Sequence, residues 1–179
     1  YNCEKSKNIL RKGIKAMVEA NKRGSAGFEL LCLLASDDPT NPDNDSYQAK
    51  AKEWAHKLEP NGSPWFSGAK LIVLSEYYMK SKDETILPKL VETAENHARG
   101  VSWFGTTGHR FAERQPDMSY GGRIAGYGPI NCSGALGFLG LSMAHKAGVQ
   151  SPVVEAAIRR QSAFFGHFAF KSGIGYGEH

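Results

Sequence analysis

One stretch of the sequence gathers residue types that bind ligands. Residues 101–132 are rich in glycine and aromatic residues and also contain imidazole, guanidinium and amide groups. Aromatic rings stack on flat ligands or sugars, and a few polar side chains fix the ligand's orientation. With aromatic residues at similar glycine-rich turns, this stretch yields a set of candidate ligand-binding residues: Trp65, Trp103, His109, Arg123, Tyr127, Asn131 and Tyr176. The expected ligand is a small molecule, a carbohydrate or a peptide. The alternative is that the glycines serve tight turns and the rings fill gaps between helices.

A second set of residues suits acid–base catalysis. Three carboxylates and a histidine flank the same turns: Glu113, Asp117, Glu178 and His179. Two carboxylates can act as general acid and general base, as they do in enzymes that cut polysaccharides. The spacing identifies no pair, because partners would come from different hairpins. An enzyme is therefore the alternative to a binding domain.

Other chemistries have less support. The cysteines Cys3, Cys32 and Cys132 lack the spacing of a disulfide framework or a zinc ribbon. We predict no metal site, no cofactor is identified, and the compartment stays open, an extracytoplasmic one included. Residues 37–45 offer oxygen ligands at alternate positions but lack the glycine and distal glutamate of a calcium loop. They favour a polar connector that caps the next helix.

The charge of the chain is concentrated in its first helix. Residues 1–23 hold seven basic and two acidic residues, a net +5, which leaves −1 for the rest of a chain whose net charge is +4. No aromatic residues are interleaved with these charges, so they indicate a solvated helix face and not a nucleic-acid partner. The longest apolar run, residues 134–144, is shorter than the roughly 20 residues that a membrane span needs. The oligomeric state is left undetermined.

The elements that position these residues are predicted to be helices of two kinds. Three amphipathic stretches repeat apolar residues at positions i, i+1, i+4 and i+5, which is a helical spacing. The first stretch has Ile9, Leu10, Gly13 and Ile14, and the others begin at Ile86 and Val153. Continuously apolar helices alternate with them and are expected to be buried on most sides: residues 28–36, 67–78 and 133–147. Glycines at every third position of the last one, Gly134, Gly137 and Gly140, predict close helix packing.

Turns of one type join these helices. A glycine with an aromatic residue close behind recurs at Gly24, Gly62, Gly100 and Gly173. A period near 40 residues with two helices per unit is typical of helical repeats. We therefore predict an all-α fold of helical hairpins in one domain over residues 1–179, with residues 101–132 as an inserted loop. We expect this domain to be a fragment of a larger ring.

The repeat has a known counterpart. Residues 156–165 (AAIRRQSAFF) with residues 171–177 (KSGIGYG), and again residues 54–65, resemble a degenerate form of the repeat in terpenoid cyclases and protein prenyltransferases. The resemblance implies an α/α toroid whose inner helices surround a cavity, and an open α-solenoid is the alternative. The aspartate-rich and zinc-binding motifs of those enzymes are missing, so their activities are not implied.

The resemblance also bears on function. Residues 171–179 are most similar to an uncharacterised bacterial branch of this superfamily, which brings no reaction with it. The sequence therefore predicts a ligand- or protein-binding helical repeat domain. A carbohydrate-active or other cavity enzyme with carboxylate acid–base catalysis is the alternative.

Overall fold

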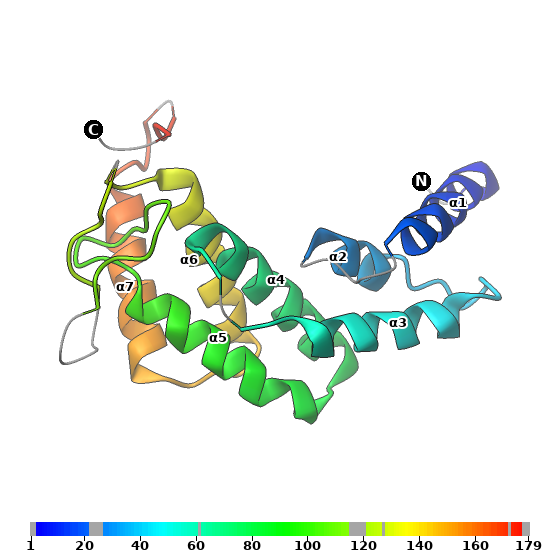
Figure 1. Ribbon diagram of the computed structural model, residues 1–179. Coiled ribbons are helices and arrows are strands. Elements are labelled where there is room, and N and C mark those ends of the chain that lie inside the picture. Colours follow the sequence, from blue (N-terminus) through cyan, green and yellow to red (C-terminus); the bar gives the residue numbers. More distant parts are fainter. Residues whose placement is uncertain are drawn as a thin grey trace.

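The chain is helical throughout its regular structure. A computed structural model describes residues 3–21, 27–60, 62–114, 121–126, 128–171 and 173–176. These residues form seven α-helices and one short 3-10 helix, and they contain no strand beyond two isolated bridges at Gly121 (Figure 1). The predicted all-α class is confirmed, and the segments expected to be buried helices are helical.

Amphipathic and apolar helices alternate along the chain. The elements are α1 (Glu4–Ala20), α2 (Phe28–Ala35), α3 (Asn44–Lys57), α4 (Pro64–Ser81), η1 (Glu84–Ile86), α5 (Leu87–Arg99), α6 (Asn131–Lys146) and α7 (Pro152–Gly166). The three continuously apolar segments of the sequence correspond to α2, α4 and α6. Helix α4 packs against α2 and α6, while α5 and α7 cover the far side of the α4–α6 pair (Figure 1). Within the described ranges, no helix combines the length and apolar character that crossing a bilayer requires.

Helices α4 and α6 approach one another through glycines. A Cβ atom placed on Gly68 would lie 2.9 Å from the backbone nitrogen of Gly137, and one on Gly140 would lie 2.7 Å from the carbonyl oxygen of Gly68. Backbone atoms cannot move aside as a flexible side chain can, so only glycine permits this approach. The close packing predicted for the glycines of α6 is confirmed.

A histidine is enclosed beside this contact. His97 of α5 is fully buried, its Nδ1 atom lies 3.1 Å from the Ser67 hydroxyl, and its ring meets Phe111 edge-on at 5.3 Å. A Cβ atom on Gly137 would collide with its Nε2 atom, which has no hydrogen-bond partner among the described residues. Burial lowers the pKa of His97 to about 4, because the charged imidazolium would lose its solvation. The neutral ring is therefore part of the packing between α4, α5 and α6.

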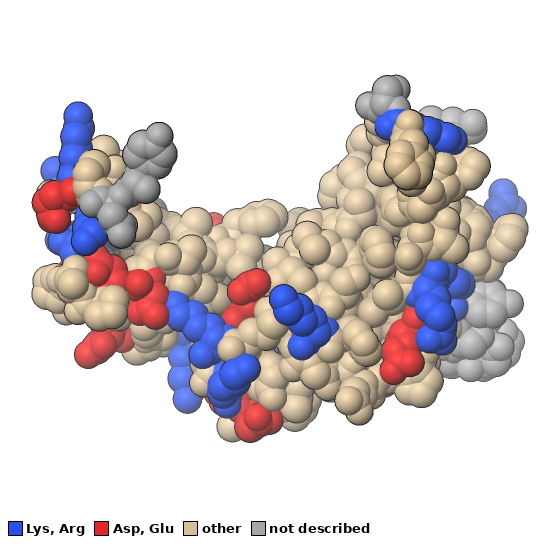
Figure 2. Space-filling view, turned by 180° about the vertical axis from the view of Figure 1, so that it is seen from behind, with Lys and Arg blue, Asp and Glu red and all other residues tan. Residues whose placement is uncertain are grey.

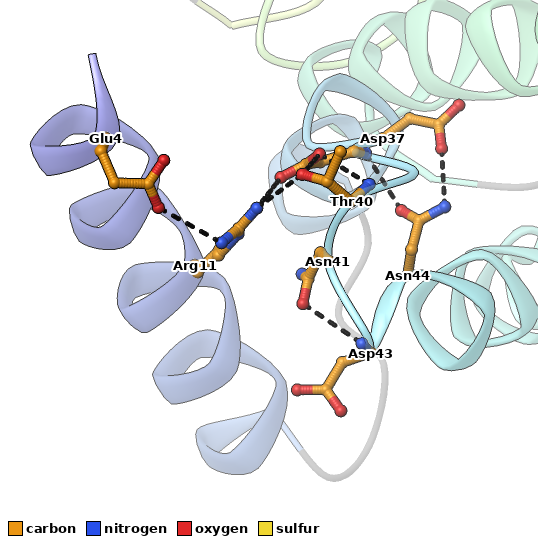
Figure 3. A network of polar contacts seen from close by, with 8 residues as sticks. Glu4, Arg11, Asp37, Thr40, Asn41, Asp43 and Asn44 are labelled. Atoms are coloured by element: carbon orange, nitrogen blue, oxygen red, sulfur yellow. Dashed lines mark hydrogen bonds and ion pairs between the residues drawn. The ribbon is translucent and has the colours of Figure 1, made fainter. Parts of the chain in front are cut away.

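Helix α1 lies at one end of the molecule and is attached through polar contacts (Figure 1). Figure 3 shows Arg11 reaching into the connector between α2 and α3, where its guanidinium lies 2.7 Å from Asp38 and 2.8 Å from the Thr40 hydroxyl. The Thr40 hydroxyl and Arg11 lower the pKa of Asp38 to about 2. Asp37 in turn lies 3.0 Å from Lys80 of α4. The connector thus joins the helices through polar contacts, as its composition predicts, but Asp43 at the N-cap of α3 makes no side-chain hydrogen bond to the helix, so the predicted capping is not found.

The apolar stripe of α1 is only partly buried. Ile14 is buried, whereas Ile9 is 64% exposed and Leu10 is 50% exposed. In η1 and α5 the same apolar code is covered, with Ile86 and Leu90 fully buried. The difference follows from neighbours, because α5 packs against α4, α6 and α7, while α1 packs mainly on α2.

Candidate functional site

Three of the predicted ligand-binding residues converge where α4 and α6 begin. The indole N–H of Trp65 donates to Nδ1 of His109 over 3.3 Å, and the two rings are stacked with centroids 6.1 Å apart. The other ring nitrogen of His109 lies 3.5 Å from the Tyr176 hydroxyl. Because an indole can only donate, Nδ1 of His109 is the acceptor of this hydrogen bond. We call Trp65, His109 and Tyr176 the ring cluster.

Separate parts of the chain supply the ring cluster. Trp65 lies in the first turn of α4, directly after Pro64, a residue suited to the first helical position. His109 comes from the inserted loop, and Tyr176 comes from the segment after α7. Asn131, the first residue of α6, holds that segment in place: its backbone N–H donates to the Tyr176 carbonyl (2.8 Å) and its side-chain amide to the Gly175 carbonyl (2.9 Å). Asn131 is only 2% exposed, so it positions the site instead of facing a ligand.

A groove with apolar walls adjoins the ring cluster. Its wider part has a volume of about 690 Å³ and is lined by Phe28, Glu29, Ser63, Trp65, Phe66, Ala69 and Leu136. A smaller part of about 360 Å³ follows along the same three helices and is lined by Leu31, Leu34, Ala35, Ile72, Glu76 and Met143. We call the two parts the inner-helix groove. Figure 2 shows the molecule hollowed between its two ends, with few acidic or basic residues on the floor of the hollow.

Two exposed phenylalanines mark this groove as unusual. Phe28 is 63% exposed and Phe66 is 61% exposed. Both side chains line the same groove, so neither is an isolated apolar residue on a polar surface. Contiguous exposed apolar surface is typical of binding sites. The sequence analysis placed Phe28 in a buried helix and did not single out Phe66, so it missed both residues.

The charged groups in the lining are both acidic. Glu29 of α2 is half-buried, and Glu76 of α4 is exposed. In the part of the chain that the structure describes, no three His, Cys, Asp or Glu side chains are grouped so that they could hold a metal ion. The groove therefore offers apolar surface with weakly acidic edges and a hydrogen-bonding aromatic end.

Two of the predicted ligand-binding residues lie apart from the ring cluster. Trp103 is 63% exposed and meets Phe104 edge-on at 5.1 Å, and the Phe104 ring lies 6.3 Å from Phe164 of α7. Arg123 is exposed, and its backbone carbonyl accepts from the backbone N–H of Glu113 over 3.0 Å. Neither lines the inner-helix groove. The structure thus corrects their grouping with Trp65.

Only one of the predicted catalytic residues, Glu113, lies among the residues that the structure describes. Glu113 is exposed on the inserted loop and lies outside the lining of the groove. Asp117, Glu178 and His179, and also the predicted ligand-binding residue Tyr127, lie outside the described residues. A carboxylate pair for acid–base catalysis stays a prediction.

The comparisons with known proteins identify a family. A family described as a domain of unknown function (DUF6288) matches residues 6–179, so nearly the whole chain, and the chain belongs to this family. Comparison with curated proteins and with solved structures finds no match.

Proposed function

We propose that this chain is a binding domain and that the inner-helix groove with the ring cluster is its recognition surface. One observation carries the proposal: an exposed apolar hollow of about 690 Å³ ends at a stacked and hydrogen-bonded pair of rings, Trp65 and His109. Ligand sites combine such apolar walls with a few polar groups that set orientation. We also propose that the alternating helices belong to an α/α toroid, in which α2, α4 and α6 face the common cavity.

The composition of the groove indicates what it would bind. Covering one phenylalanine side chain contributes roughly 1.5–3 kcal/mol, so Phe28 and Phe66 favour a ligand with a sizeable apolar body. His109, Tyr176 and Ser63 offer donors and acceptors at one end only. The ligand should therefore be amphiphilic, with its polar group toward the ring cluster.

Binding of an apolar aromatic probe tests this proposal. Titration with anilinonaphthalene sulfonate, followed by the dye's fluorescence, should show saturable binding to the native protein. Trp65→Ala and Phe66→Ser should each weaken it at least tenfold while the circular dichroism spectrum stays helical.

Trp103→Ala is the matched control, because it removes an exposed tryptophan that does not line the groove. Its affinity for the dye should equal that of the unchanged protein. Equal affinity in Trp65→Ala and in the unchanged protein would refute the assignment of the recognition surface.

A further inference from the structure

Helix α1 carries an apolar face that nothing in the described structure covers. Ile9, Gly13, Ala16 and Ala20 follow one another at helical spacing, and all four are exposed. Ile9 is 64% exposed, and a Cβ atom on Gly13 would meet no atom within 4 Å. We call these four residues the outer face of α1. It is small and flat, and a second helix can approach it closely.

The repeat in the sequence indicates what covers this kind of face. Ile86 at the end of η1 and Leu90 of α5 occupy the positions in the code that Ile9 and Gly13 occupy in α1, and both are fully buried. In α7 the corresponding Ala157 is also fully buried. Both helices are covered by apolar helices, α5 by α4 and α6, and α7 by α6. By the same pattern, the outer face of α1 suits an apolar helix.

The inner-helix groove offers a surface of this kind. Along α4 the groove is lined by Trp65, Phe66, Ala69, Ile72 and Glu76, and all of these except Phe66 follow the spacing i, i+4, i+7 and i+11 of the outer face of α1. This stripe is about 16 Å long at 1.5 Å per residue, close to the length of the outer face. On either side, α2 and α6 provide apolar walls, and Leu139 of α6 adds a 52% exposed side chain at helical spacing from Leu136. The groove therefore matches one helix in length and periodicity.

The charges of the two surfaces are also complementary. The charged residues in the groove lining are Glu29 and Glu76, both acidic. Lys5 and Lys12 flank the outer face of α1, and both are exposed. Opposite charges at an interface favour encounter and fix orientation. A negatively charged or neutral helix would lack this match.

We propose that a second copy of this chain occupies the inner-helix groove with its α1 helix. The two copies are related by a twofold axis, so the outer face of α1 in each copy packs into the groove of the other. In such an arrangement each copy contributes the same two surfaces, as in most homodimers. The inference rests on the proposed function, since it names the partner of the same recognition surface. It also makes dimer formation and ligand binding compete.

Sedimentation velocity of the intact chain over a range of concentrations measures this association. The native protein should show a concentration-dependent dimer, and Ile9→Glu and Phe66→Glu should each weaken it at least tenfold. Phe170→Glu is the matched control, because Phe170 is fully exposed after α7 and outside both surfaces. A native protein that stays monomeric at all concentrations overturns the inference, and so does a dimer that Phe66→Glu leaves intact.

Charge reversal provides an independent arm that does not depend on apolar contacts. Lys5→Glu with Lys12→Glu should weaken the dimer, and Glu29→Lys with Glu76→Lys should weaken it to a similar extent. All four changes in one chain should restore the dimerisation constant to within about threefold of the native value. A fourfold variant that stays as weak as the twofold variants contradicts the pairing of these two surfaces.

Dye binding and sedimentation of the intact chain together separate failure of this inference from failure of the proposed function. If the dye binds in a Trp65-dependent way but the native protein stays monomeric, the second copy is the wrong occupant and the recognition surface stands. If the dye does not bind and no dimer forms, both proposals fall.

Discussion

The contact between α4 and α6 and the attachment of α1 are two ways of joining helices in one chain. At the first, Gly68 and Gly137 bring two backbones together, and the buried ring of His97 fills the space beside them. At the second, Arg11 and Asp38 form an ion pair, and Gly13 faces open space. A glycine inside a helix is thus indispensable in one region and unconstrained in the other. The neighbours of a helix, and not its own sequence, decide which case applies.

Acidification should have the largest effect, and it should act on the α4–α6 region. The pKa of His97 is about 4 in the folded protein, below its ordinary value of 6.5. Between pH 6.5 and 4 the unfolded chain binds a proton that the folded chain does not. Stability should therefore fall as the pH falls through this window, by about 3 kcal/mol in total, and His97 should contribute no further loss below pH 4.

Urea unfolding at pH 7, 5.5 and 4 measures this effect. His97→Gln should flatten the dependence on pH, whereas His167→Gln, which changes an exposed histidine, should leave it unchanged. A native protein that is equally stable at pH 7 and pH 4 would show that the His97 ring is not enclosed as described.

A methyl group at the helix contact should have the next largest effect. Gly68→Ala should destabilise the protein by roughly 2 kcal/mol, because its Cβ atom would meet backbone atoms of Leu136 and Gly137 at 3.0 and 2.9 Å. Gly13→Ala is the counterpart in α1 and should stabilise the protein by up to about 1 kcal/mol, since alanine favours a helix and the space is open. Urea unfolding checks both signs, and the same sign for both variants would remove the contrast between the two regions.

Removing the ion pair of α1 should have the smallest effect. Arg11→Ala should raise amide exchange in α1 by about threefold to fivefold and leave exchange in α4 and α6 unchanged, because this half-buried ion pair holds α1 locally and ion pairs near the surface contribute little to global stability. Hydrogen exchange measured by mass spectrometry resolves the two regions. Lys15→Ala, which removes another exposed basic residue of α1, is the control and should change neither.

The helices could be predicted from sequence because their signals are local. The apolar segments 67–78 and 133–147 correspond to α4 and α6, and the glycines of α6 pack as closely as their spacing predicts. That Ile9 is exposed could not be predicted, since an apolar stripe shows that a helix is amphipathic but not which element covers it. The enclosure of His97 depends on residues from three elements and left no local signal.

The residue types of the candidate site could be predicted from the sequence, but their arrangement in space could not. Trp65 and His109 are 44 residues apart, and His109 and Tyr176 are 67 residues apart, so no spacing reveals that they meet. Trp103 belongs to the same loop as His109 but to a different cluster. The loop turns at Gly105, where φ is +103° and the backbone packs against Arg160 and Phe164 of α7, and it then runs along α6 through Thr107 and Ser133. Residues before and after this turn therefore face different surfaces.

The glycines of α6 also fix the angular setting of that helix. Gly134 faces Thr106 of the inserted loop, Gly137 faces His97 of α5, and Gly140 faces Gly68 and Leu71 of α4. Residues three apart in a helix differ in direction by about 60°, so the three glycines point toward three different neighbours. If α6 rotated about its long axis, side chains next to these glycines would collide with the neighbouring backbone or with the ring of His97. These contacts thus fix the rotation of α6 about its axis, and with it the distance between the walls of the groove that α6 and α4 form.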